Sequence, residues 1–187
     1  MMLKLKYSII LIFAMSLVMS SCEKEDPEIP NEEELITTVN YYLTADNGNS
    51  TMTLSFKDLD GDGGNEAEIT GGVLEANTVY SGRIELLNEA ETPIENITEE
   101  VDEEGTLHQF FFQPTIPDLS IKYSDVDNNG NPIGIKSELS TGTTANGTLT
   151  IILRHEPNKT ASGVANGDIG NAGGETDIQV TFPIDVQ

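Results

Sequence analysis

The sequence lacks tryptophan, contains a single cysteine and has few basic residues, and each shortage bears on function. Its 187 residues include 9 Lys and Arg against 32 Asp and Glu, which gives a formal net charge of −23. Such a charge argues against nucleic acid or an anionic lipid surface as a partner. Without tryptophan, the chain offers little of the stacked aromatic surface that sugar-binding sites use. Because Cys22 has no second cysteine to pair with, no disulfide can form within the chain.

Common catalytic motifs are also missing. The sequence has no G-x-S-x-G nucleophile turn, no H-E-x-x-H metal motif and no glycine-rich phosphate loop. Its 32 acidic residues allow many carboxylate pairs to be imagined, and for that reason no particular pair stands out. The sequence therefore predicts a protein that is not an enzyme.

The N-terminus has the layout of a secretory signal peptide. Lys4 and Lys6 form a basic start, and an apolar run from Ile9 to Val18 leads to small residues before Cys22. The apolar run is shorter than the roughly 20 residues of a membrane-spanning helix. Four charged residues follow the cysteine directly. We therefore expect residues 1–21 to be a signal peptide.

Met19-Ser20-Ser21-Cys22 resembles the lipobox of bacterial lipoproteins, in which the cysteine is lipidated and becomes the first mature residue. This resemblance implies a membrane anchor of more than one acyl chain on Cys22, which is what stable anchoring requires. The next four residues, 23–26, resemble the signal by which Bacteroidota place lipoproteins on the outer face of the outer membrane. The alternative is a solvated acidic tether. We expect an outer-membrane lipoprotein that faces the cell surface or the periplasm.

Residues 22–33 are predicted to form an acidic tether, because Pro27, Pro30 and several acids leave too little apolar surface to order the segment. Residues 34–187 are then predicted to form one domain. A chain of this length can bury roughly 68–70% of its unfolded surface around a single core.

Short apolar–polar alternations recur through this domain, between turns rich in Gly, Asn and Asp. Period-two alternation puts one face of a strand in a core and the other in water. The pattern predicts an all-β fold, an immunoglobulin-like antiparallel β-sandwich of about seven to nine strands with one short helix. Gly82 interrupts one apolar face, and Pro183 predicts that the last strand lies at a sheet edge. The alternating segments are 35–43, 52–57, 80–86, 119–123, 149–153 and 178–186.

One segment has helical spacing instead. Asn96 followed by Glu99 resembles a capping box, and Gly105 is placed to end the helix. About two turns of helix are therefore predicted between strands. The apolar residues at helical spacing are Ile94, Ile97 and Val101.

Two loops carry the opening half of a calcium-binding motif. Each follows a strand and fits D-x-[DN]-x-[DN]-G, in which alternate oxygens converge on a hard cation. Neither is an EF-hand, because Ile69 and Lys136 stand where its bidentate glutamate would be. The alternative is that Asp, Asn and Gly are simply good turn residues. The predicted Ca²⁺ ligands are Asp58, Asp60, Asp62 and Glu66 (or Glu68) in the first loop, and Asp125, Asp127 and Asn129, with Asp118 as a weaker addition, in the second.

The two histidines form an alternative candidate site. His108 and His155 each end an alternating apolar row, and Glu104 lies just before His108. If these strand ends meet, two imidazoles and a carboxylate would suit Zn²⁺ or another transition metal. Zn²⁺ is the less favoured ion, and the competing interpretation is two hydrogen-bonded histidines at the rim of the sandwich.

A third polar stretch runs from Asn166 to Asp177. Its glycine content predicts that it does not pack, and its length exceeds that of a simple hairpin turn. Together with Pro157 to Gly163, it is expected to form either a mobile binding rim or an exposed loop.

The chain as a whole resembles a group of small Bacteroidota lipoproteins. Some members carry the label of a type 1 periplasmic binding fold, which does not suit a sequence so poor in helix. The sequence as a whole predicts a lipid-anchored surface binding or accessory module, associated with a cation or with an outer-membrane uptake transporter. The alternative is a structural or adhesive surface protein with calcium-stiffened loops. Besides the N-terminal motif, the resemblance rests on residues 58–64, 108–112, 123–134, 153–157 and 173–182.

Overall fold

The computed structural model describes residues 35–48, 50–61 and 64–187. The described residues all belong to one compact unit of the chain. The predicted signal peptide (1–21), lipidation site (Cys22) and acidic tether (22–33) lie outside the described residues.

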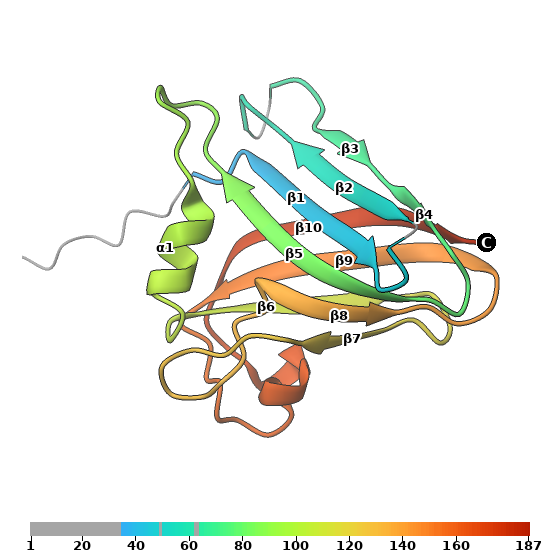
Figure 1. The fold of residues 1–187 in the computed structure, drawn as a ribbon. Helices are drawn as coiled ribbons and strands as arrows, with labels where there is room; N and C mark the ends of the chain where they lie inside the picture. The colour runs from blue at the N-terminus through green and yellow to red at the C-terminus, as the bar shows by residue number, and fades with distance from the viewer. Residues whose placement is uncertain (1–34, 49, 62–63) are drawn as a thin grey trace, which may run out of the picture. The chain divides into compact units, whose positions relative to one another are not determined.

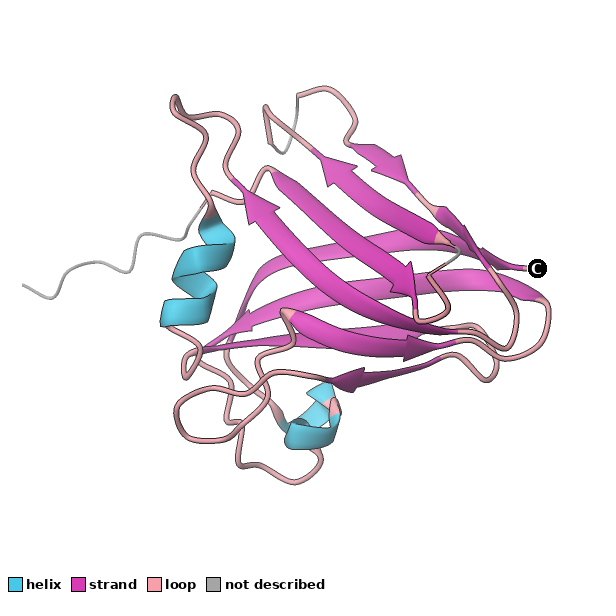
Figure 2. Cartoon of the chain, in the orientation of Figure 1, coloured by secondary structure: helices cyan, strands magenta, loops and turns pink. Residues whose placement is uncertain are grey.

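Among the described residues, ten strands, one α-helix and two short 3₁₀-helices follow one another along the chain (Figures 1 and 2). The strands are β1 (Thr38–Ala45), β2 (Thr51–Lys57), β3 (Glu68–Thr70), β4 (Gly72–Leu74), β5 (Val79–Leu87), β6 (His108–Pro114), β7 (Ser120–Tyr123), β8 (Lys136–Ser140), β9 (Ala145–His155) and β10 (Glu175–Val186). The helices are α1 (Ile97–Glu103), η1 (Val164–Asn166) and η2 (Ile169–Asn171).

The strands form two sheets. The six-stranded sheet has the order β3-β2-β1-β5-β8-β7, and the four-stranded sheet has the order β4-β10-β9-β6. All neighbours are antiparallel except β4 and β10, which pair in parallel. The predicted β-sandwich is therefore confirmed, with ten strands rather than seven to nine. An immunoglobulin-like arrangement is not confirmed.

The core lies between the sheets and is built from the alternating faces of the strands. Tyr41, Tyr80, Phe110 and Phe182 are completely buried in it. On β10, the buried residues recur at every second position from Val180 to the end of the strand, as the sequence predicts. This burial of large apolar side chains is the main source of stability, since the chain has no disulfide.

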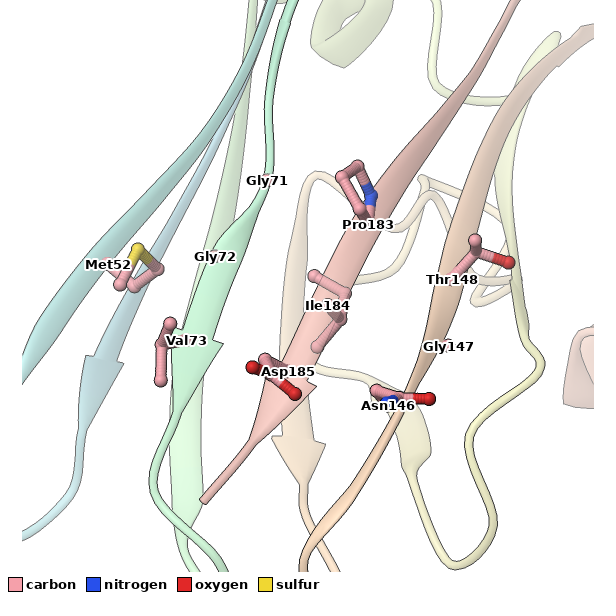
Figure 3. Close-up of a pocket in the computed structure, with 10 residues that line it drawn as sticks. All are labelled: Met52, Gly71, Gly72, Val73, Asn146, Gly147, Thr148, Pro183, Ile184 and Asp185. Carbon is pink, nitrogen blue, oxygen red and sulfur yellow. The ribbon is translucent and has the colours of Figure 1, made fainter.

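Glu68–Leu74 joins the two sheets along one side, because β3 pairs with β2 and β4 pairs with β10. Gly71 permits this crossing, since a Cβ there would lie 2.1 Å from the carbonyl oxygen of Pro183. Figure 3 shows these residues beside a hollow of ≈ 660 Å³ on the outer surface. The prediction that β10 is an edge strand was wrong for its final residues, because β4 pairs with it from Ile184 onward.

The stretch from Pro157 to Gly174 packs on the outer face of the four-stranded sheet. Val164 and Ala172 join Phe111 and Ile152 in a second, smaller apolar cluster. The prediction that residues 166–177 do not pack was therefore wrong, because Ala172 is buried in this cluster. The glycines of the stretch instead let the chain turn tightly enough to form η1 and η2.

Helix α1 forms where it was predicted and links the two sheets. The side chain of Asn96 accepts a hydrogen bond from the backbone N–H of Thr98 at 3.2 Å and donates one to Glu99 at 2.9 Å. The hydroxyl of Thr98 bonds both backbone groups of Leu86, which ties the helix to β5. Ile97 and Val101 are buried, whereas Ile94 is exposed. The helix and the turn that follows it set the start of β6.

Gly82 interrupts an apolar face of β5 because the ring of Tyr41 needs the space. A Cβ at Gly82 would lie 2.5 Å from the hydroxyl oxygens of both Tyr41 and Ser137, which share a buried hydrogen bond of 2.7 Å. We expect Gly82→Ala to lower the free energy of unfolding by about 1–3 kcal/mol through overpacking. Urea unfolding measures this change.

Ser81→Ala is the matched control, since it alters an exposed neighbour on the same strand. It should change stability by no more than about 0.5 kcal/mol. Equal effects of the two substitutions would contradict this explanation of the glycine.

Candidate functional site

The structure brings the two histidines together. Strands β6 and β9 are antiparallel neighbours, and their register places His108 directly opposite His155. The ring centroids lie 4.8 Å apart with an interplanar angle of 34°. His108 is buried and His155 is partly exposed. The condition stated above for a shared histidine site, that the two strand ends lie together, is therefore fulfilled.

Asp177 on β10 supplies a carboxylate beside the pair. Pairing of β10 with β9 slips between Thr176 and Ile178, so Asp177 is the extra residue of a β-bulge. Bulges re-aim side chains in this way. One carboxylate oxygen of Asp177 lies 3.8 Å from Nε2 of His108. One potential ligand atom from each of His108, His155 and Asp177 lies within 4.8 Å of the other two.

Glu104, the acid that the sequence suggested for this site, takes part in a different way. Its backbone carbonyl, not its carboxylate, faces His108, at 3.3 Å from Nδ1. A carbonyl oxygen can only accept, so Nδ1 carries the proton and Nε2 of the neutral ring keeps its lone pair. Asp177 is thus the carboxylate of this group, and no local sequence pattern marks it, because its position depends on the bulge.

The environment of His108 favours its neutral form, which is the form that binds metals. Burial lowers the pKa of His108 below the ordinary histidine value, the hydrogen bond to Glu104 acts in the opposite direction, and the neighbouring His155 lowers it further. Two imidazoles and one carboxylate are a donor set that suits Zn²⁺ and related transition metals. A backbone carbonyl on the second nitrogen is also the usual way of orienting such a histidine.

In the second acidic loop, the carboxylates of Asp125 and Asp127 accept hydrogen bonds from nearby backbone N–H groups. Asp127 accepts hydrogen bonds from the backbone N–H groups of Asn129 and Asn131 at 2.8 and 2.9 Å. Asp125 accepts from the N–H groups of Gly134 and Lys136, both at 2.7 Å. Asn129 takes part here through its N–H. The structure does not bring Asp118 to this loop, because it precedes β7 whereas the loop follows that strand.

Lys159 supplies a positive charge to this loop. Its ammonium donates to a carboxylate oxygen of Asp127 at 3.0 Å, to the carbonyl of Pro132 at 2.9 Å and to the carbonyl of Gly105. Three acceptors require three N–H donors, so the group is an ammonium. Lys159 is only 5% exposed and Asp127 only 8%. In this loop, the positive charge beside the Asp127 carboxylate comes from a lysine. Calcium binding at this loop stays a prediction.

The first acidic loop is more exposed. Asp58 accepts from the N–H groups of Asp60 and Gly61, at 3.3 and 2.8 Å. Asp60 accepts from the backbone and side chain of Asn65, and these bonds lower its pKa. The two acids line a surface hollow of ≈ 290 Å³ with Glu66 and Glu68, while Asp62 lies outside the described residues. Calcium binding at this loop also stays a prediction.

The hydrogen bonds of Asp127 make stability depend on pH. Burial alone would raise the pKa of Asp127, but the N–H groups of Asn131 and Asn129 and the Lys159 ammonium hold it below its ordinary value. A lowered folded-state pKa stabilises the fold above the unfolded value, about 3.9, and this contribution is lost as the pH falls through the folded value. Urea unfolding at about pH 5 and pH 3 should show a larger loss for the wild type than for Asp127→Asn.

Asp102→Asn, which changes an exposed carboxylate on α1, serves as the control and should keep the wild-type pH dependence. The same acid-induced loss in the wild type and in Asp127→Asn would show that the contacts of Asp127 do not govern this dependence.

Comparison with protein-family models, curated proteins and solved structures found no match to this chain. Within the described part of the chain, no helix is long and apolar enough to cross a membrane. Function is therefore inferred from the chemistry of the residues that the fold brings together, chiefly His108, His155 and Asp177.

Proposed function

We propose that this chain is a lipid-anchored outer-membrane protein whose β-sandwich binds a divalent transition metal, with Zn²⁺ as the first ion to test. The observation that carries the proposal is the convergence of His108, His155 and Asp177, with one ligand atom of each within 4.8 Å of the others. The three residues come from adjacent strands of one sheet. This framework supports a preorganised site, because strands hold ligands more firmly than loops do.

The ligand types favour a transition metal over calcium at this position. Ca²⁺ takes six to eight oxygen ligands, whereas imidazole nitrogen suits zinc, copper, nickel and iron. His108 is oriented by the Glu104 carbonyl, and Asp177 brings a negative charge that offsets part of the charge of the ion. Both features lower the cost of assembling the site around a metal.

The proposed location at the outer membrane rests on the N-terminal sequence. Acyl chains on Cys22 would hold an acidic, disulfide-free domain at the outer membrane, at the cell surface or the periplasmic face. A metal-binding domain in that place fits an accessory role beside an outer-membrane uptake transporter. Under metal limitation, such an accessory would be induced and required for growth.

A structural or adhesive surface protein is the rival proposal. The acids of the first loop support it, because Asp58, Asp60 and Glu66 line one surface hollow and Ca²⁺ there would stiffen the loop. Extracellular sites of this kind bind with dissociation constants of roughly 10⁻⁴–10⁻³ M. Thermal unfolding with calcium, magnesium or chelator separates the two proposals, since only the rival requires calcium to raise the melting temperature.

The zinc site is tested by Asp177→Asn, which keeps the size of the side chain and removes its charge. We expect the full-length protein in detergent to bind zinc, and the substitution to weaken that binding at least about tenfold, because one of three ligands becomes a poor one. Isothermal titration calorimetry measures the affinity, and elemental analysis of the purified protein identifies the metal.

Asp185→Asn is the matched control, since Asp185 lies near the other end of β10 and is bonded to Gln187. It should leave zinc affinity unchanged. Equal zinc affinity in the wild type and in Asp177→Asn, or zinc binding that is lost only after Asp58 and Asp60 are changed, would remove this proposal.

The anchor is tested at the sole cysteine. Cells fed labelled palmitate should incorporate it into the wild-type protein and not into Cys22→Ser, and the variant should move from the membrane fraction to the soluble fraction. Because the chain has no other cysteine, thioether-linked lipid on the protein must be on Cys22. Equal labelling of the two proteins would contradict the lipoprotein assignment without affecting the zinc site.

A further inference from the structure

The turn between α1 and β6 contacts both histidine segments of the proposed metal site. The carbonyl of Glu104 faces Nδ1 of His108 at 3.3 Å. The carbonyl of Leu107 accepts a hydrogen bond of 2.6 Å from the backbone N–H of Glu156, the residue after His155. This turn, residues 104–107, therefore sets the orientation of His108 and holds the end of the strand that carries His155.

Lys159 holds the same turn through its side chain. Its ammonium donates to the carbonyl of Gly105, which lies between the two carbonyls just described. It also donates to Pro132 and Asp127, and Asp127 is in turn fixed by two backbone N–H groups of its own loop. One buried charge thus joins the turn to the loop between β7 and β8.

These contacts give the carbonyl of Glu104 little freedom. It accepts a hydrogen bond of 2.8 Å from the backbone N–H of Leu107 as well as the one from the ring Nδ1 of His108. Gly105 is packed so closely that a Cβ there would lie 2.6 Å from Ile133. A turn held by a charge-assisted hydrogen bond is held more strongly than one held by neutral bonds alone.

We propose that Lys159 is a positioning residue of the metal site, which fixes the turn 104–107 so that His108 presents Nε2 toward Asp177 and His155. This inference rests on the proposed metal-binding function. Lys159 contacts the site through the turn, and its role is to select the proton position and the direction of the His108 ring. Supporting contacts of this kind typically change metal affinity by about 10–100-fold.

Lys159→Met tests the proposal, because methionine keeps an unbranched apolar stem and has no charge. In the full-length protein in detergent, we expect zinc affinity to fall about tenfold. In the metal-free protein, ¹⁵N spectra of the imidazole nitrogens should show His108 with the proton on Nδ1 in the wild type and shared between both nitrogens in the variant. A role confined to stability would lower the melting temperature and leave the proton of His108 in place.

Two further variants make the outcome decisive. Lys57→Met removes a partly exposed lysine paired with Glu89 and should leave zinc affinity and the His108 spectrum unchanged. The double variant Lys159→Met/Asp127→Asn removes both buried charges, so that neither is left without its partner if the single variant fails to fold. It should show the same loss of zinc affinity and of the fixed His108 proton.

Folded variants that bind zinc within twofold of the wild type, or that keep the proton of His108 on Nδ1, would overturn the positioning role. Failure of the underlying function looks different, since it appears as a wild-type protein that binds no zinc. The His108 spectrum of metal-free protein still tests the contact with Lys159 in that case.

Discussion

One end of this sandwich depends on a single buried ammonium. Lys159 bonds Gly105, Pro132 and Asp127, which belong to the turn after α1 and to the loop between β7 and β8. A buried charge is costly unless it is paired and fully hydrogen-bonded. Burial accordingly lowers the pKa of Lys159 while Asp127 acts in the opposite direction. The segments around the lysine must therefore stay together, and the turn that faces His108 is one of them.

The fold could be predicted from the sequence where its signals are local. Alternation along β10 predicted which residues are buried, and Asn96 with Gly105 predicted the limits of α1. The parallel pairing of β4 with β10 could not be predicted, because a three-residue strand carries almost no periodicity of its own. The packing of residues 157–174 could not be predicted from the sequence for a related reason. Its few apolar residues gain their partners, such as Phe111, only from a distant strand.

In the candidate site, too, local sequence patterns predict some residues and not others. Each histidine could be placed at the end of a row by alternation, and pairing of β6 with β9 was a modest further step. Asp177 joins them through a bulge, and a one-residue slip in register sends a side chain to the opposite face. Lys159 lies 32 residues from Asp127 in the sequence. No local pattern marks either residue, since both roles exist only once distant strands have packed.

The two acidic loops show why a motif does not by itself define a site. Both have alternate acids and a closing glycine, and both follow strands of the six-stranded sheet. In one, the oxygens of Asp127 are turned inward to backbone amides and a lysine. In the other, Asp58 and Asp60 remain at the surface beside Glu66. The same sequence motif thus forms an internal ion pair in one loop and an acidic surface hollow in the other. The surrounding charge and burial decide what each carboxylate binds.

The histidines also lie at a particular end of the sandwich. Thr38 at the start of β1 pairs with Leu87 at the end of β5, so the described chain enters the sandwich at the end from which α1 departs (Figure 1). Helix α1 leads from there to His108 at the start of β6. The proposed metal site thus lies at the end of the domain where β1 begins and β5 ends.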